Sequence, residues 1–323
     1  MSRQGTRIGE WTGGVDRSVT PVIGVILIVA LVVIIAASFG AVAFGFTDKL
    51  GGTDYASSGQ CGVTEFDPEN VDNFADERSN VYDVECAMWF EADSLDKADG
   101  ETVSTWSDRS GNEIDATSDS RVDDPKWRSN VDGIDAVVFE GSNGLSTELN
   151  TTDIGVSGDS AFSVSVVIQV DDEDHEGTIT QFGLPTASAE DYFRYGYNGD
   201  TGPDDTPWFI SLGNGGFWGH EPNKDSSGGQ WSIITYVNDG DQISVYLNGE
   251  LRTEKSTDYD ISDHPIQIGF ETDDNGEVPG KGWFKGPIAE IVVFERPITD
   301  NERRTIECQM EDKYDGAVSA SGC

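Results

Sequence analysis

Residues 231–256 read WSIITYVNDGDQISVYLNGELRTEKS, and this stretch decides the fold class. Two runs, 231–238 and 242–247, are rich in the β-branched and aromatic residues that are typical of strands. Asn248 and Gly249 then supply the two positive φ angles of a type I′ turn, which connects adjacent antiparallel strands. The sequence therefore predicts a β-hairpin with its turn at Asn248-Gly249.

Similar runs recur on both sides of this hairpin. From about Val84 onward, Gly, Asn, Asp and Pro turns separate further strand-like segments, which read VECAMWF, DAVVFE, AFSVSVVIQV, GTITQFG, YFRYGY, WFISLG, IQIGF and IAEIVVFE. Near the end, Thr299 and Glu302 in TDNE form a capping box that opens a helix. We expect a mostly β fold, an antiparallel two-sheet jelly-roll sandwich with a short C-terminal helix.

Several longer segments of this region occur in the order found in a known family. They are MWFEADSL, DGETVSTWSDRSGNEIDAT, DAVVFEGSNGLST, WSIITYVNDGDQISVYLNGE and IAEIVVFERPITDNERRTIECQMEDKYDG. Together they resemble a laminin-G-like, concanavalin A-like domain over residues 84–316. The resemblance implies the sandwich fold but no single activity, because this fold carries lectins, adhesion modules and hydrolases.

The N-terminal region contains a long uncharged segment. No charged residue occurs from Ser18 to Thr47, and the apolar run PVIGVILIVALVVIIAASFGAVAFGF is long enough to cross a bilayer as one helix. Arg3, Arg7 and Arg17 precede it, so the start is expected in the cytoplasm and the rest outside. A secretory signal peptide is disfavoured, because the apolar run is about twice the usual length of such a signal.

The segment VDRSVTPVIGVILIVALVVIIAASFGAVAFG closely resembles the N-terminus of archaeal type IV pilins. By that resemblance, a prepilin peptidase cuts between Ser18 and Val19, with Arg17 and Ser18 as the recognised flank. Bacterial pilins have Glu at the fifth mature position, whereas this chain has Ile23, as is usual in the archaeal kind. A plain single-pass membrane anchor is the alternative interpretation.

Once the leader is removed, an all-round apolar helix can leave the lipid for a bundle of identical helices. The residues expected in the filament core are Pro21, Val22, Ile23, Gly24, Ile26, Leu27, Val29 and Leu31. The expected organisation is a prepilin leader (1–18), a hydrophobic pilin helix (19–46), a hinge and acidic linker (47–83), a laminin-G-like sandwich (84–316) and a C-terminal tail (317–323).

The chain is strongly acidic, with 60 Asp and Glu against 20 Lys and Arg and a formal net charge of −40 at pH 7. Residues 1–50 hold three acids and four bases, so the remainder carries −41. Such a surface repels phosphate backbones, and nucleic acid is therefore not expected as a partner. Acids scattered through every loop fit a protein that works in concentrated salt, where screening shortens repulsion to a few Å.

Four cysteines, Cys61, Cys86, Cys308 and Cys323, follow the apolar segment and are expected on its oxidising side. Four cysteines are expected to form two disulfides, and the sequence does not choose among the three possible pairings. In a helix over 300–314, Cys308 points away from the apolar face, so core burial does not explain it. A bridge from Cys308 to Cys86 would join the two ends of the sandwich and leave Cys61 for Cys323. Closing so long a loop is worth about 4 to 5 kcal/mol.

Catalysis is not expected from the acidic residues. Hydrolases on this sandwich that resemble bacterial glucanases carry acids at alternate positions of one strand, facing one cleft, and no such run occurs here. Glu290 and Glu295 are the nearest case, but their spacing places them on opposite faces of a strand. The three histidines lie in polar turns with no nucleophile elbow nearby, which argues against a serine triad.

Sugar binding requires an exposed aromatic ring beside amides and carboxylates that bind hydroxyl groups. The stretch PWFISLGNGGFWGHEPNK offers the best candidates, which are Trp208, Phe217, Trp218, His220 and Asn223. Most other tryptophans are expected in the core, because Trp89, Trp231 and Trp283 lie in strand patterns.

Two further surface features are candidates for binding or modification. Asp273, Asp274 and Asn275 lie in TDDNGE, and the laminin-G resemblance implies calcium binding through such loop carboxylates, although no cofactor is required. The sequon Asn150-Thr151-Thr152 lies in a predicted turn, where it could be glycosylated outside the cell.

Taken together, these features predict a subunit of an archaeal type IV pilus-like filament. The helix polymerises into a homo-oligomeric filament core, and the sandwich is displayed at the cell surface for adhesion to surfaces or glycans. Before assembly the chain is inserted in the membrane. The alternatives are a minor or tip pilin adhesin, and a membrane-anchored binding protein or glycoside hydrolase that never polymerises.

Overall fold

The computed structural model describes much of the region that follows the predicted hinge and linker, together with a short strand within that linker. The described residues are 59–61, 84–169, 176–185, 192–198, 208–212, 217–218, 229–256, 259–280 and 282–323. The chain divides into two units, Met1–Asp54 and Tyr55–Cys323, and only the second contains described residues. The predicted leader and pilin helix therefore lie outside them. Within the described part of the chain, no helix is long and apolar enough to cross a membrane.

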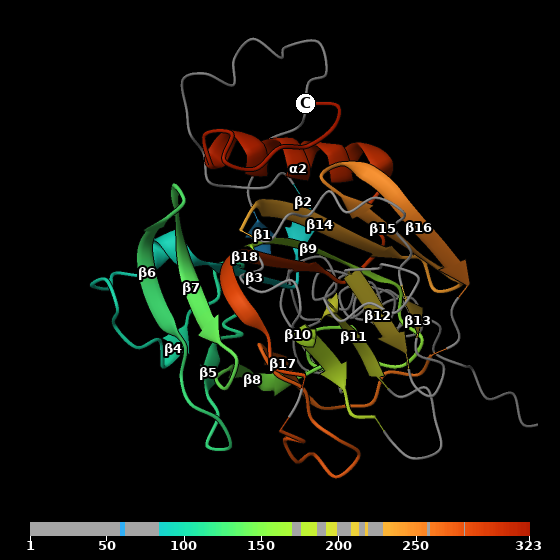
Figure 1. Cartoon of the computed structure of the whole chain (residues 1–323). Helices are drawn as coiled ribbons and strands as arrows, with labels where there is room; N and C mark the ends of the chain where they lie inside the picture. Colours follow the sequence, from blue (N-terminus) through green and yellow to red (C-terminus); the bar gives the residue numbers. More distant parts are fainter. Residues whose placement is uncertain are drawn as a thin grey trace, which may run out of the picture. The chain divides into compact units, whose positions relative to one another are not determined.

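One eight-stranded antiparallel sheet, sheet I, has the strand order β13-β12-β11-β10-β17-β8-β5-β4 (Figure 1). Its strands are β4 (Thr105–Trp106), β5 (Ala116–Ser118), β8 (Leu145–Asn150), β10 (Glu176–Gly183), β11 (Tyr192–Asn198), β12 (Trp208–Leu212), β13 (Phe217–Trp218) and β17 (Pro265–Ile268). Because β17 lies between β10 and β8, segments distant in sequence meet in the middle of this sheet.

The second eight-stranded sheet, sheet II, has the order β16-β15-β14-β9-β18-β7-β6, with β3 also paired to β18. Its strands are β3 (Met88–Glu91), β6 (Lys126–Val131), β7 (Ile134–Glu140), β9 (Phe162–Gln169), β14 (Trp231–Asn238), β15 (Gln242–Leu247), β16 (Glu250–Ser256) and β18 (Lys285–Phe294). A small ribbon pairs β1 (Gly59–Cys61) with β2 (Val84–Cys86), and η2 (Ala92–Ser94) is a short 3-10 helix. The predicted two-sheet antiparallel sandwich is thus confirmed.

The inner core lies between the two sheets and is rich in aromatic rings. Phe162 and Phe193 pack edge to face with ring centroids 5.0 Å apart, and Tyr195 lies 4.6 Å from Tyr236. All four side chains are buried. These rings come from strands of both sheets, so their packing holds the sheets together.

An outer core lies between sheet II and the C-terminal helix α2 (Asp300–Lys313), which runs across the far face of that sheet (Figure 1). Ile306 and Met310 of α2 are fully buried in this outer core. Sheet II is therefore covered on both faces, which explains why β9 is buried at every residue and β18 at every residue after Lys285, rather than at alternate residues. The predicted capping box is confirmed at Thr299 and Glu302.

The hairpin that decides the fold class also forms as predicted. Asn248 and Gly249 connect β15 to β16 with φ angles of 51° and 80°. The C-terminal tail packs on this turn, because Ser321 N donates to Asn248 O at 2.7 Å. A Cβ atom at Gly249 would lie 2.6 Å from Ser321 N, so the turn needs glycine for space as well as for conformation.

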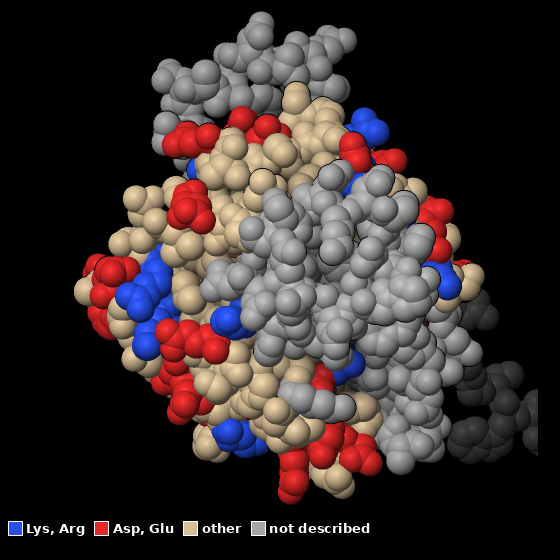
Figure 2. Space-filling model, in the orientation of Figure 1, with Lys and Arg blue, Asp and Glu red and all other residues tan. Residues whose placement is uncertain are grey.

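The surface bears out the expected scatter of acidic residues. Figure 2 shows Asp and Glu side chains over much of the described surface in view, with Lys and Arg side chains among them. Several bases pair with neighbouring acids, as in Lys126 with Glu140 and Arg128 with Asp99. Such exposed pairs contribute little to stability, so their main effect is to reduce local repulsion.

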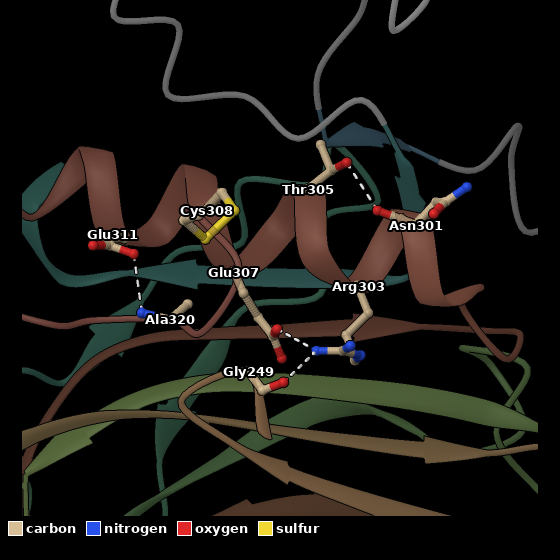
Figure 3. Close-up of a disulfide and its surroundings, with 9 residues drawn as sticks. Gly249, Asn301, Arg303, Thr305, Glu307, Cys308, Glu311 and Ala320 are labelled. Carbon is tan, nitrogen blue, oxygen red and sulfur yellow. Dashed lines mark hydrogen bonds and ion pairs between the residues drawn. A yellow bond between two sulfur atoms is a disulfide. The ribbon is translucent and has the colours of Figure 1, made fainter. Parts of the chain in front are cut away.

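The disulfide pairing differs from the prediction. Cys308 bonds to Cys323, with Cα atoms 5.3 Å apart, and therefore not to Cys86 (Figure 3). The tail after α2 turns back along the helix, and Ala320 N donates to Glu311 Oε2 at 2.9 Å, which brings Cys323 to the outward-facing Cys308. Cys86 is also disulfide-bonded, and the described residues include no free cysteine. The side chain of Cys61 lies outside them.

Candidate functional site

A row of polar side chains crosses the face of sheet I that points away from the inner core. Neighbouring strands from β11 to β4 contribute Arg194, Gln181, Gln267, Ser146, Thr117 and Thr105, which are paired in register. Strand alternation explains the row: Ile266 and Ile268 point into the inner core, so Gln267 between them points outward. We call these residues the polar row.

One end of the polar row holds the chain segment that follows β17. The amide of Gln181 donates from Nε2 to Thr272 Oγ1 at 2.8 Å and accepts from Thr272 N at 3.2 Å. Arg194 forms an ion pair with Glu271. These contacts commit Gln181 and Arg194 to positioning the segment 270–284 against the sheet.

At the other end of the polar row, Asp119 and Arg121 form an acid–base pair. Arg121 Nε donates to Asp119 Oδ1 at 2.8 Å, and the hydroxyl of Ser146 donates to Asp119 Oδ2 at 2.7 Å. Burial favours a higher pKa for Asp119, but hydrogen bonds from Arg121 and Ser146 outweigh it and lower the pKa to about 2. The pair therefore carries no net charge at neutral pH and fixes the orientation of Ser146.

Two polar atoms near this pair have no hydrogen-bond partner among the described residues. They are Gln267 Oε1, on a fully buried side chain, and His264 Nε2. Burial, and then the charge of Arg121, lowers the pKa of His264, so its ring is neutral at pH 7. Buried polar atoms are usually paired, so the unused hydrogen-bonding capacity of these two atoms is unusual, but neither atom is exposed at the surface.

The segment 270–284 also carries two stacked aromatic rings, and one of them lies near Arg121. Trp283 stacks on Phe270 with ring centroids 6.0 Å apart, and the guanidinium of Arg121 lies 5.7 Å from the Phe270 ring. Trp283 is partly exposed, so the prediction of a core position for it was wrong, because it follows a loop rather than occupying a strand interior. Trp89 and Trp231 are buried as predicted.

The predicted glycan-binding residues fall largely outside what the structure describes. Trp208 begins β12, and Phe217 and Trp218 form β13 at the edge of sheet I, but their side chains are not described. His220 and Asn223 lie outside the described residues. The structure therefore places Phe217 and Trp218 on the edge strand of the sheet that bears the polar row, and Trp208 on the strand beside it.

Sequence reasoning missed the polar row itself. The strand segment PIQI (265–268) carried the signal, because its single polar residue between two isoleucines must face away from the core. The partners of Gln267 could not be identified in this way, since β8 and β10 are distant in sequence and their register is a tertiary property.

The turn proposed for calcium uses its carboxylate within itself. Asp273 Oδ1 accepts from Asn275 N and from Glu277 N, both at 2.9 Å. Asn275 Nδ2 donates to Asp274 Oδ1 at 2.8 Å. Among the described residues, no group of three or more His, Cys, Asp or Glu side chains could hold a metal ion. The geometry of this turn therefore gives the calcium hypothesis no support, and it stays a prediction.

The sequon lies at the end of β8, near the surface. Asn150 is partly buried, and its Nδ2 donates to Asp263 Oδ2 at 3.3 Å, while Thr152 is exposed. The buried Thr151 between them donates its hydroxyl hydrogen bond to Ser262 O at 2.8 Å. Glycosylation at Asn150 stays a prediction.

The carboxylates considered for hydrolysis do not share an open site. Glu290 is fully buried beneath α2, where Trp89 and Tyr314 donate to it, whereas Glu295 is exposed beyond the end of β18. Glu91, opposite Glu290 in register, is buried as well. A polysaccharide chain cannot reach two carboxylates that lie under a packed helix.

A family model described as the concanavalin A-like lectin/glucanases superfamily matches residues 139–302, about half of the chain. The chain belongs to this superfamily. The matched region of the concanavalin A-like domain begins in β7 and ends in α2, and so includes the centre of the polar row. A second family model, for the N-terminal region of archaeal type IV pilins, matches residues 17–53.

Solved structures with a distantly similar fold include carbohydrate-associated domains. Domain 4 of AbnA, an extracellular arabinanase from Geobacillus stearothermophilus in complex with arabinotriose, has a TM-score of 0.48 and 19% identity, covering 67% of this chain and 95% of that one. The Ruminococcus gnavus IT-sialidase module CBM40, bound to α2,3-sialyllactose, has a TM-score of 0.42 and 14% identity, covering 53% and 95%.

Trypanosoma rangeli sialidase in complex with sialic acid has a TM-score of 0.46 and 13% identity, covering 70% of this chain but 33% of the sialidase. A comparison with curated protein sequences finds no match.

Proposed function

We propose that this chain is a subunit of an archaeal type IV pilus-like filament whose concanavalin A-like domain binds glycans. The observation that carries the proposal is the presence, in one chain, of a segment matching the archaeal pilin N-terminus and a domain of the lectin/glucanase superfamily. The first supports membrane insertion followed by assembly, and the second supports display of a binding surface.

The N-terminal helix supplies assembly in this proposal. A prepilin peptidase removes the basic leader between Ser18 and Val19, and the apolar helix that follows then packs with identical helices. The chain thus passes from the membrane into an extracellular filament. The acidic domain stays in water, because its charge opposes burial in the lipid bilayer or among the packed helices of the filament.

The polar row, together with Trp283, is the proposed glycan-binding face. Ser146 provides a partly exposed, oriented hydroxyl, and Trp283 provides a partly exposed ring for the apolar face of a sugar. We propose binding rather than hydrolysis because the carboxylates considered for hydrolysis, Glu290 and Glu295, do not share an open site.

The charges at this face favour a neutral glycan over an acidic one. Arg121 pairs with Asp119, and Arg194 pairs with Glu271, so both guanidinium groups near the row already bind carboxylates. The net charge of −41 beyond residue 50 also repels sugars that carry carboxylates. We therefore expect a ligand recognised through hydroxyl groups.

Sequencing the mature N-terminus from purified filaments tests the assembly part of the proposal. Processing as proposed gives a chain that begins at Val19 and copurifies with the filaments. A chain that begins at Met1 or Ser2, or filaments without this polypeptide, would contradict it.

A panel of immobilised neutral and acidic glycans tests the binding part. Trp283→Ala and Ser146→Ala should each weaken binding of the best neutral ligand by about tenfold, since the first removes the aromatic ring and the second removes about one hydrogen bond. Ser244→Ala is the matched control, because this exposed hydroxyl lies on β15 of sheet II. Unchanged binding in both variants, or preference for acidic glycans, would reject this face as the site.

The size of the displayed domain favours a second role, that of a minor or tip pilin. Residues 84–316 form a bulky unit to repeat along a whole filament. Antibody labelling along the filament length would indicate a major subunit, and labelling confined to tips would indicate a minor one.

Hydrolysis is tested separately by incubating a polysaccharide panel with the chain and its variants Glu290→Gln and Glu295→Gln. We expect no sugar release from any of the three. Release that either variant abolishes would show that the domain is an enzyme.

A further inference from the structure

A lysine and two glutamates meet beneath α2, inside the outer core. Lys313, in the last turn of α2, donates from Nζ to Glu290 Oε2 at 2.9 Å and also to Glu91 Oε1. Glu91 on β3 and Glu290 on β18 stand opposite each other in register. The two acids are 1% and 0% exposed, and the lysine side chain is 9% exposed. An amine is thus held between two carboxylates in a nearly water-free site.

The two carboxylates have different surroundings. Glu290 Oε1 accepts from Trp89 Nε1 at 2.6 Å, and its Oε2 accepts from Tyr314 OH at 2.7 Å, so two neutral donors solvate this carboxylate. Burial raises the pKa of Glu91 to about 7, although Lys313 opposes the rise. Burial lowers the pKa of Lys313, but the charges of Glu290 and Glu91 outweigh it and raise that pKa, so the lysine rests as an ammonium and its proton moves to Glu91 only during the reaction. Glu290 lies within hydrogen-bond distance of the same nitrogen, where it can relay a proton.

We propose that Lys313 and Glu91 condense into an amide, an isopeptide bond that joins α2 to β3. The ammonium first passes a proton to the carboxylate of Glu91, which gives an amine and a neutral acid. Lys313 Nζ then attacks Glu91 Cδ. Glu290 moves a proton from the nitrogen to the departing hydroxyl, so a C–N bond forms, a C–O bond breaks and one water leaves. Nothing is oxidised or reduced, and Glu290 is regenerated.

Three physical factors favour this reaction. Fixed contact between amine and carboxyl replaces a bimolecular encounter, and well-oriented groups of this kind reach effective concentrations of about 10⁵ to 10⁸ M. Water is nearly excluded, so the amide is protected from hydrolysis once the released water has left. The reaction also converts two buried charges into a neutral amide, which removes the desolvation cost of the ion pair.

Other charged groups around the cluster suit the proposed step. Arg109 Nε lies 3.5 Å from Glu91 Oε2, where it can stabilise the oxyanion of the tetrahedral intermediate. Asp93 Oδ1, from η2, lies 4.0 Å from Lys313 Nζ. It keeps the amine in place but is farther from it than Glu290.

The proposed bond supplies a connection that the disulfide does not. Glu91 and Lys313 are 222 residues apart in the sequence. An amide between them would therefore link β3, near the start of the domain, to α2, near its end. The Cys308–Cys323 disulfide spans a sequence separation of only 15. A domain displayed outside the cell would then resist unfolding even where reductants break its disulfides.

Peptide mass mapping of the full-length folded protein tests the inference. After reduction, alkylation and denaturation, trypsin does not cleave beyond an amide-linked Lys313. We expect a branched product of residues 79–97 and 305–323, lighter than the sum of the two peptides by the mass of one water. Separate linear peptides 79–97 and 305–313 from the wild-type protein would overturn the inference.

Two variants define the roles of the groups. Lys313→Arg retains the positive charge but provides no amine for this bond, and Glu290→Gln retains the shape but removes the proton carrier. Both should give only linear peptides, with folding checked by circular dichroism. A branched product from Glu290→Gln would overturn the role assigned to Glu290, and the wild-type digest remains decisive even if a variant fails to fold.

Discussion

The two outward faces of the sandwich differ in what covers them. On sheet II, α2 packs through side chains such as Ile306 and Met310 and forms a second core. On sheet I, the corresponding face carries the polar row, with Gln267 and Ser146 near its middle. The difference teaches that a helix packed on one sheet makes that face part of the core, whereas the other sheet keeps polar side chains on its outward face and is the face proposed for glycan binding. The predictions below test this division.

The largest expected effect comes from weakening the contact between α2 and sheet II. Ile306→Ala should lower the free energy of unfolding by about 2 to 5 kcal/mol, because the side chain is fully buried. Thr117→Ala in the polar row is the control, and its effect should stay within about 0.5 kcal/mol. Urea denaturation of both variants measures the difference. Equal losses would show that the two faces do not differ in structural role.

Removing the disulfide should have the next largest effect. Replacing Cys308 and Cys323 together with Ser frees a loop of separation 15, which is worth about 3 kcal/mol in the chain-entropy model. Glycan binding at sheet I should remain unchanged, since both residues lie on the α2 side. Thermal or urea unfolding under non-reducing conditions measures the loss. A change in glycan affinity would break the proposed separation of the two faces.

The cluster beneath α2 should give a pH dependence that reveals whether Glu91 is free. With a folded-state pKa of about 7, above the ordinary 4.5, free Glu91 contributes stability below pH 4.5 that is lost as pH rises through 7. In Lys313→Arg, unfolding free energy should therefore fall by up to about 1.4 kcal/mol per pH unit across this window.

Two comparisons isolate the contribution of Glu91. Adding Glu91→Gln to Lys313→Arg should remove this slope, and the wild-type chain should lack it too if the amide has formed. The measurement is urea denaturation at a series of pH values between 4.5 and 7.5. An identical slope in the wild type and in Lys313→Arg would contradict the amide.

A smaller effect of opposite sign is expected on sheet I. The lowered pKa of Asp119, about 2 against 3.8, means that its contribution is present above pH 3.8 and is lost as pH falls through 2. Asp119→Asn should cost about 1 kcal/mol at pH 7 after allowance for solvent screening, and less at pH 3. A stability difference that does not shrink on acidification would contradict the pairing with Arg121.

Local sequence patterns predicted the local structure well. The turn at Asn248-Gly249 and the capping box at Thr299 required only neighbouring residues, because each is stabilised within a few positions of the chain. The same reliance on neighbouring residues led to the wrong prediction of a core position for Trp283. Its aromatic neighbourhood reads like a strand, but the loop after β17 carries it to a partly exposed position on Phe270.

By itself, the sequence determined the fold class, the hairpin, the C-terminal helix and the uneven distribution of charge, since these follow from residue periodicity, turn chemistry and composition. Only the tertiary structure decided that Cys323 meets Cys308, that Gln267 joins a row with Ser146, and that Lys313 lies between Glu91 and Glu290. Each of these contacts depends on the register of distant strands or on the face where a helix packs, and that choice minimises the free energy of the whole domain rather than of any local segment.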